Sequence, residues 1–227
     1  WRDIDFTTLL RQRQNLVITV TAAEGVVVPA MAFGNGDDEA WWPGVGESTE
    51  WEFPVARVPG TAAYLVVHNP GLGPVEVAVD LFTPGGPIIE AFTATVSPEA
   101  PARFDLSAYP GDPLAARVVA SGPVAAAVVA LGEGEVAVMP GAAEAAATWL
   151  LPGVQRLALH ATSLWLLNTA SEEAITATVS SLSSAGTSGQ TVVVPPGVPV
   201  QVDVTVLGAS GFLVEASSSL TVAWTTR

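Results

Sequence analysis

Few side chains in this sequence could perform chemistry. The two histidines, His68 and His160, do not occupy equivalent places in the internal repeat of the chain, so a shared metal site or catalytic triad is not indicated. Ser163 and Ser171 lack the Gly-x-Ser-x-Gly context of a nucleophilic serine. Phosphate-binding loops, dinucleotide fingerprints and His-Glu-x-x-His motifs do not occur, and there is no cysteine for thiol catalysis or zinc. The sequence therefore predicts a protein that is not an enzyme and has no cofactor and no metal site.

The densest group of charges is acidic and lies between Asn35 and Glu52. It holds six carboxylates and no basic residue, interleaved with Trp41, Trp42 and Trp51. One interpretation is a solvated linker whose tryptophans dock on neighbouring domains. The other is a cation loop, because the oxygens of residues 35–39 resemble a calcium ligand set, although the alternating spacing of an EF-hand is missing.

Tryptophan is the other residue type with binding potential, since aromatic rings on a β-sandwich can stack on sugars or anchor a protein interface. Trp165 and Trp224 lie inside apolar stretches, where burial in a core is expected. Trp41 and Trp42 precede a proline in a polar context and are expected to be the most exposed pair. We predict that Trp41, Trp42 and Trp51 contact a partner, with a protein interface favoured over a sugar platform.

Composition excludes some partners. The net charge is -14 and every basic residue is arginine, so the chain should repel nucleic acid and anionic lipid. It contains no run of about 18 uncharged apolar residues, so no membrane insertion is expected within it. A signal peptide or membrane anchor before Trp1 stays open.

The elements that would position these side chains are strands. Alternating segments such as 75–81 and 201–206, together with 18 prolines and 21 glycines, are typical of short strands joined by tight turns. Helix is expected only at Thr7–Arg13 and, as one or two turns of an alanine-rich linker, at Ala142–Thr148.

The strands recur in an internal repeat. Trp51 matches Trp149, Pro54 matches Pro152 and Asp105 matches Asp203, each 98 positions apart. We predict an all-β fold of two tandem immunoglobulin-like antiparallel β-sandwich units, related by an internal repeat of about 98 residues, at 51–140 and 149–227. Residues 1–50 are predicted to form an N-terminal β-hairpin, within 15–34, followed by the acidic Trp-containing linker.

The Trp-x-x-Pro start of each unit, the strand ending in asparagine and the later Ser-Gly-Pro-Val hairpin resemble an uncharacterised actinobacterial family. This is an extracytoplasmic cell-envelope family, a domain of unknown function with tandem β-rich repeats, and the resemblance covers roughly residues 15–227. It implies an extracytoplasmic location, a tether by a membrane helix N-terminal to residue 1, and no known catalytic activity. It also implies a place beside membrane glycosyltransferases of cell-wall assembly.

The expected function is that of a non-catalytic extracytoplasmic scaffold of the bacterial cell envelope. Its partner would be a membrane or envelope protein, with a cell-wall glycosyltransferase as one candidate. The alternative is a carbohydrate-binding module for cell-wall glycan, which needs an exposed aromatic platform beside polar groups.

Overall fold

The protein is all-β, as predicted. The computed structural model describes residues 4, 17–25, 28–35, 38–57, 60–133, 136–153, 162–183, 186–204 and 210–226. Within these ranges the single helical segment is the 3-10 turn η1 (Leu106–Ala108), which Asp105 caps by accepting a hydrogen bond from the Ser107 amide. The segment Thr7–Arg13, predicted to be helical, lies outside the described residues. No described helix has the length and apolarity needed to cross a membrane.

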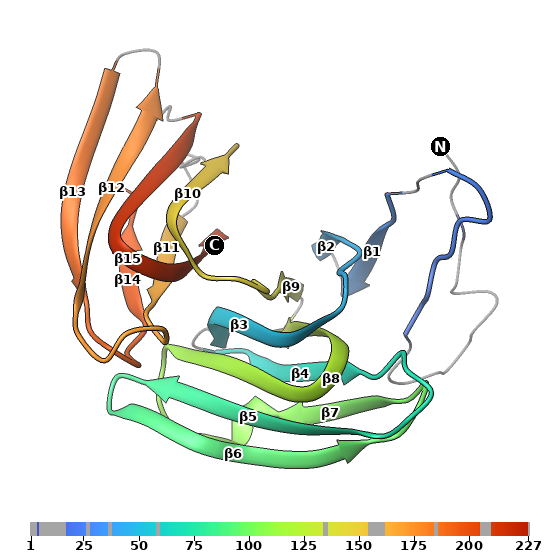
Figure 1. The fold of residues 1–227 in the computed structure, drawn as a ribbon. Helices are drawn as coiled ribbons and strands as arrows, with labels where there is room; N and C mark the ends of the chain where they lie inside the picture. The colour runs from blue at the N-terminus through green and yellow to red at the C-terminus, as the bar shows by residue number, and fades with distance from the viewer. Residues whose placement is uncertain are drawn as a thin grey trace.

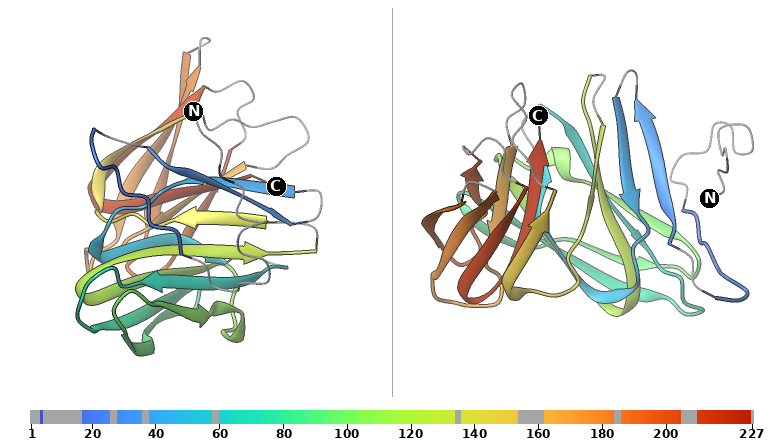
Figure 2. Two further views of the ribbon diagram at one scale, coloured as in Figure 1. Left: turned by 90° about the vertical axis from the view of Figure 1, so that its right-hand side faces the viewer. Right: turned by 90° about the horizontal axis from the view of Figure 1, so that it is seen from above.

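The first described strands form a hairpin, at a different place from the predicted one. Strand β1 (Ala30–Asn35) pairs antiparallel with β2 (Asp38–Pro43), so the backbone of Trp41 and Trp42 belongs to a strand and not to a linker. Asn35 pairs with Asp38, and the sequence between them, Gly36-Asp37, is a dipeptide typical of two-residue hairpin loops. Figures 1 and 2 show the hairpin in blue on the side of the molecule where β2 contacts β9.

Strands β3–β9 are called unit 1 here. They are β3 (Ser48–Arg57), β4 (Ala62–His68), β5 (Val75–Thr83), β6 (Gly86–Val96), β7 (Pro101–Asp105), β8 (Leu114–Leu131) and β9 (Val136–Pro140). Their order is β6-β5-β8-β4-β7, with β3 and β9 also paired to β8. The first half of β8 pairs with β3 and β5, and its second half pairs with β4 and β9. Because β8 runs through both layers, the sheets curl around one core (Figure 1).

Strands β10–β15 are called unit 2. They are β10 (Ala146–Pro152), β11 (Thr162–Leu167), β12 (Ile175–Ser183), β13 (Gly186–Val194), β14 (Val200–Asp203) and β15 (Gly211–Thr226). Residues 146–148 were predicted to be helical, but they belong to β10. The pairing of β10 with β15 overrides the helix propensity of alanine, and Ala142 bridges to Glu52 of β3.

The two units share one strand order. Unit 2 runs β13-β12-β15-β11-β14 with β10 also paired to β15, which repeats the order of unit 1 except that β9 has no counterpart. The indole Nε1–H of Trp51 donates to the Val124 carbonyl at 2.8 Å, and that of Trp149 donates to the Leu220 carbonyl at 2.8 Å. This is the arrangement expected of the predicted internal repeat. The tryptophan of each Trp-x-x-Pro start joins the first strand of its unit to the last long strand.

The asparagine that follows β4 holds a tight turn in unit 1. Asn69 is fully buried, and its Nδ2 donates to the carbonyls of Gly73 and Val96 at 2.8 and 2.9 Å. Its Oδ1 accepts from the Gly71 amide at 2.9 Å. In unit 2, Asn168 is likewise buried and makes the corresponding bonds to Glu173 and Ser171.

Substitution of Asn69 by alanine should lower the free energy of unfolding by about 1–3 kcal/mol, because three hydrogen bonds are lost and buried backbone groups lose their partners. Urea denaturation measures this change. Asn69→Asp is the matched variant. It keeps the bond from the Gly71 amide but cannot donate to the two carbonyls, so it should also destabilise. An Asn69→Asp protein as stable as the wild type would contradict this account.

Candidate interaction surface

The two units meet through a strand that is buried on both faces. In β11, Leu164 and Leu166 face the core of unit 2, while Trp165 belongs to the core cluster of unit 1. Leu167, also fully buried, packs with Phe82 and Ala115 of unit 1. The alternation of a strand places residues 165 and 167 on the same side. Trp165 was predicted to be buried, and it is, at 3% exposure, but within the neighbouring unit.

A buried carboxylate lies at the centre of this junction. Glu52 of β3 is only 6% exposed, and both of its oxygens accept hydrogen bonds from unit 2. The hydroxyl of Thr169 donates to Oε1, and the hydroxyl of Thr221 donates to Oε2 at 2.8 Å. Burial of a carboxylate is energetically unfavourable unless the group is hydrogen-bonded. The two threonine hydroxyls therefore compensate for the desolvation of Glu52.

A groove of about 490 Å³ opens beside Glu52. Its polar lining is Glu50, Arg117, Glu144 and Thr169 together with Glu52. Arg117 forms an ion pair with Glu50 at 2.7 Å. Among the described residues no group of three or more acidic or histidine side chains is placed to hold a metal ion. Residues of both units line the groove, so it lies at the polar margin of the junction.

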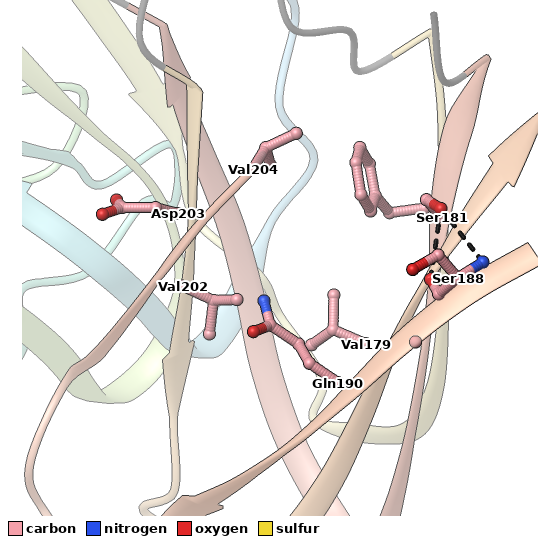
Figure 3. Close-up of a pocket in the computed structure, with 9 residues that line it drawn as sticks. Val179, Ser181, Ser188, Gln190, Val202, Asp203 and Val204 are labelled. Atoms are coloured by element: carbon pink, nitrogen blue, oxygen red, sulfur yellow. Dashed lines mark hydrogen bonds between the residues drawn. The ribbon is translucent and has the colours of Figure 1, made fainter. Parts of the chain in front are cut away.

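A smaller pocket of about 100 Å³ lies between β12–β13 and β14 of unit 2 (Figure 3). The Ser181 hydroxyl donates to the Ser188 carbonyl at 3.1 Å and accepts from the Ser188 amide at 3.3 Å. Figure 3 shows Asp203 directed away from these serines, and its carboxylate accepts from Ser163 and Gln201 instead. Ser181 therefore links β12 to β13 through hydrogen bonds, and no base lies beside it among the described residues that line the pocket.

The outer face of unit 2 carries leucines on three neighbouring strands. Leu150 of β10 is paired with Leu213 of β15, and Leu182 of β12 lies diagonally beside Leu213. We call these three residues the leucine face. Leu150 is 61% exposed, and the other two are half-buried. The outward side of a solvent-facing antiparallel sheet is usually polar, and clustered apolar side chains there are typical of protein contacts.

The comparisons with known proteins give the family but no activity. A family model described as "Family of unknown function (DUF5719)" matches residues 47–226. The chain belongs to this family. The matched range begins one residue before β3 and ends with β15, so it spans unit 1 and unit 2 together.

Two further comparisons carry no functional information. No curated protein matches the chain. A solved structure titled "Crystal Structure of Thermotoga maritima 1070" is 17% identical, with a TM-score of 0.38, and covers 44% of this chain and 97% of its own. A likeness at that TM-score supports no argument.

The tryptophans predicted to bind a partner differ in their exposure in the structure. Trp51 is only 4% exposed and lies in the core of unit 1, so it is a core residue and not an accessible anchor. Trp42 is half-buried on β2, and the side chain of Trp41 lies outside the described part. Trp224 was predicted to be a core residue, but its side chain is 49% exposed at the end of β15.

The remaining candidate residues that the structure describes do not form a common catalytic or metal site. His160 and the side chains of residues 35–39, which were considered for calcium, lie outside the described part. His68 ends β4, and its Nδ1 is buried without a hydrogen-bond partner among the described residues. Ser163 donates to Asp203 at 2.9 Å and has no histidine in that pair.

Sequence reasoning missed the leucine face, although the signal was present. Trp149, Leu150 and Leu151 are three consecutive apolar residues, and the middle one must point outward when its neighbours point inward. Its counterpart in unit 1 is Glu52, which follows Trp51 as Leu150 follows Trp149. A comparison of the two starts, position by position, would have identified Leu150 as an apolar residue on an outward position.

Proposed function

We propose that this protein is a non-catalytic interaction or scaffold protein of the bacterial cell envelope, located outside the cytoplasm and tethered by a membrane helix N-terminal to residue 1. Its leucine face would bind a protein partner of the envelope. The observation that carries the proposal is the 61% exposure of Leu150 beside Leu213 on the outward side of unit 2. Such a patch is stabilised when a partner removes it from water. The actinobacterial origin and the role beside cell-wall glycosyltransferases rest on the resemblance alone.

Crosslinking capture from native membranes tests this proposal. The chain as bait should retain one envelope protein at near-stoichiometric amount, and the Leu150→Glu bait should lose it, because the new charge would be desolvated at the contact. Ile89→Glu is the matched control, since Ile89 on β6 is 64% exposed and lies outside the leucine face. Equal loss with both variants, or retention with Leu150→Glu, would contradict the assignment of this face.

A carbohydrate-binding module is the second candidate, and one observation favours it. Trp224 is 49% exposed, which is the accessibility an indole needs to stack on a sugar ring. A blank capture combined with retarded migration of the chain in gels containing cell-wall polysaccharide would support this alternative. The retardation should then disappear in Trp224→Ala and persist in Leu150→Glu.

A further inference from the structure

We infer that unit 2 binds an extended peptide segment of another protein, which adds as a strand to the outer edge of β13 and places an aromatic side chain in the pocket between β13 and β14. This site is separate from the leucine face and goes beyond the proposed function, because it defines the chemistry of a second contact. Two independent observations support it. One is the set of aromatic rings that fills the same place in unit 1, and the other is the unprotected edge of β13.

In unit 1, aromatic rings close the opening between the edge strands β6 and β7. The ring centroid of Phe92 on β6 lies 5.3 Å from that of Phe104 on β7 and 5.1 Å from that of Tyr109. The Tyr109 hydroxyl donates to the Ala91 carbonyl of β6 at 2.7 Å. The two sheets of unit 1 are therefore joined on this side by packed rings.

The first of these rings has no counterpart in unit 2. Val79 and Val179 are equivalent, since each is paired with the residue of the long strand that also pairs with the first tryptophan of its unit. The partner of Val79 on β6 is Phe92, whereas the partner of Val179 on β13 is Gln190. A polar side chain therefore takes the place of the β6 ring.

The second ring is also absent from its place in unit 2. Asp105 matches Asp203 in the internal repeat, so the residues before them, Phe104 on β7 and Val202 on β14, are equivalent. The pocket of about 100 Å³ lies where these two substitutions meet. Figure 3 shows Gln190 directed from β13 toward Val202 of β14.

The pocket has an apolar interior and an open mouth. Four of the residues that line it are buried and apolar: Val179, Val202, Val204 and Phe212. At the mouth, the three consecutive residues 188–190 of β13 are all exposed. An apolar side chain inserted between β13 and β14 would be removed from water, as the rings of unit 1 are.

The strand beside this mouth has an unprotected edge. Among the described residues β13 pairs only with β12, and it is the outermost strand of its sheet (Figure 1). Its nine residues, Gly186–Val194, include no charge and no proline, and its register with β12 is unbroken. The equivalent edge strand β6 contains Pro87 and Glu90, and its register with β5 is shifted near Glu90, whose φ is 49°. Prolines, charges and bulges protect edge strands from pairing with other chains, so β6 is protected and β13 is not.

These observations define the chemistry of the partner segment. An extended segment that pairs with β13 gains main-chain hydrogen bonds, and its alternate side chains point toward the pocket. One of them would be aromatic, since unit 1 places phenylalanine rings there. The net charge of -14 favours a neutral or basic segment over an acidic one.

Fluorescence anisotropy with a synthetic peptide and the full chain tests the inference. The labelled probe is Arg-Thr-Val-Thr-Phe-Thr-Val-Thr-Arg, which the wild type should bind. Replacement of the peptide phenylalanine by alanine should weaken binding about 10-fold or more, because burial of the ring is lost. A peptide with prolines in place of the two central threonines should not bind, since it cannot form the hydrogen-bond ladder of a strand.

Filling the pocket from within the chain gives the matching result on the protein side. Gln190→Phe combined with Val202→Phe installs the residues of unit 1 and should weaken binding of the probe about 10-fold or more. Gln190→Phe alone changes an exposed side chain and should act in the same direction. Thr191→Phe is the matched control, because Thr191 is exposed and faces the other side of β13, so this variant should bind like the wild type.

The inference is overturned by a wild type that does not bind the probe at millimolar concentration, by equal binding of the alanine or proline peptide, or by unchanged affinity in both Gln190→Phe variants. Leu150→Glu should bind the probe like the wild type, since the leucine face is not part of this site. A chain that binds no probe but captures an envelope protein through Leu150 overturns this inference alone. A chain that binds the probe but captures no envelope protein overturns the assignment of the leucine face alone.

Discussion

Replacement of Trp165 by alanine is expected to uncouple the two units and to lower the free energy of unfolding by about 3–5 kcal/mol. The indole belongs to a strand of unit 2, yet it lies at 3% exposure in the core cluster of unit 1. Its Nε1–H donates to the Thr225 hydroxyl at 2.9 Å. Removal of the ring leaves a cavity in unit 1 and removes an apolar contact that unit 2 makes with it.

Urea denaturation, followed by both fluorescence and circular dichroism, measures this effect. The wild type should unfold in one transition, because Trp165 and Glu52 join the units. The Trp165→Ala variant should show separate transitions by the two probes. Trp224→Ala is the matched control, since that indole is 49% exposed and its loss should cost about 1 kcal/mol or less. A single, equally cooperative transition in Trp165→Ala would show that the junction does not depend on this residue.

Replacement of Arg57 by methionine should destabilise unit 1 by roughly 3–5 kcal/mol, because it removes a buried cation and leaves the groups that accept its hydrogen bonds without a donor. The Arg57 side chain is 7% exposed, and its Nε pairs with Asp112 at 3.0 Å. Its two terminal nitrogens donate to three backbone carbonyls, those of Leu106, Tyr109 and Gly111. These carbonyls belong to the loop between β7 and β8, which methionine cannot hold because it has no donor.

The free energy of unfolding from urea denaturation checks this prediction, with Arg103→Met as the matched control. The Arg103 guanidinium lies 3.6 Å from the centroid of the Tyr64 ring at an exposed position, and such a stacking contact is worth about 0.5–1 kcal/mol. Arg57→Lys should recover only part of the loss, since one ammonium cannot reach all four acceptors. A cost for Arg57→Met no greater than that for Arg103→Met would refute the structural role of Arg57.

The alanine-rich segment before β10 shows where local reasoning fails. Residues 142–148 have the composition of a helical linker, and a helix was the natural expectation from propensity alone. In the structure Ala142 bridges to Glu52, and residues 146–148 begin a strand along β15. The pairing partners lie some 70 to 90 positions away in the sequence, so no local pattern could have indicated them.

The tryptophans show that local sequence is also insufficient to predict which side chains lie on an interaction surface. Trp165 was correctly predicted to be buried because it stands in an apolar run, but the unit that buries it was not predictable. Trp51 follows an acidic segment and was predicted to contact a partner, whereas its ring lies in the core of unit 1 and its Nε1–H donates to the Val124 carbonyl. Residue type and neighbours determine the tendency toward burial, and only the packing of distant strands determines which surface remains free.

By itself, the sequence determined the all-β class, the strand at 75–81 and the recurring Trp-x-x-Pro motif at Trp51 and Trp149. Period-two patterning and turn residues are local features of the sequence, and recurring motifs are found by comparing one segment with another. Only the tertiary structure decided that β11 is shared between two cores, that Glu52 is held by Thr169 and Thr221, and that Leu150 points outward beside Leu213. The physical reason is that alternation assigns a residue to one of two sides of a strand, while the neighbour that covers that side is chosen by contacts between residues far apart in the chain.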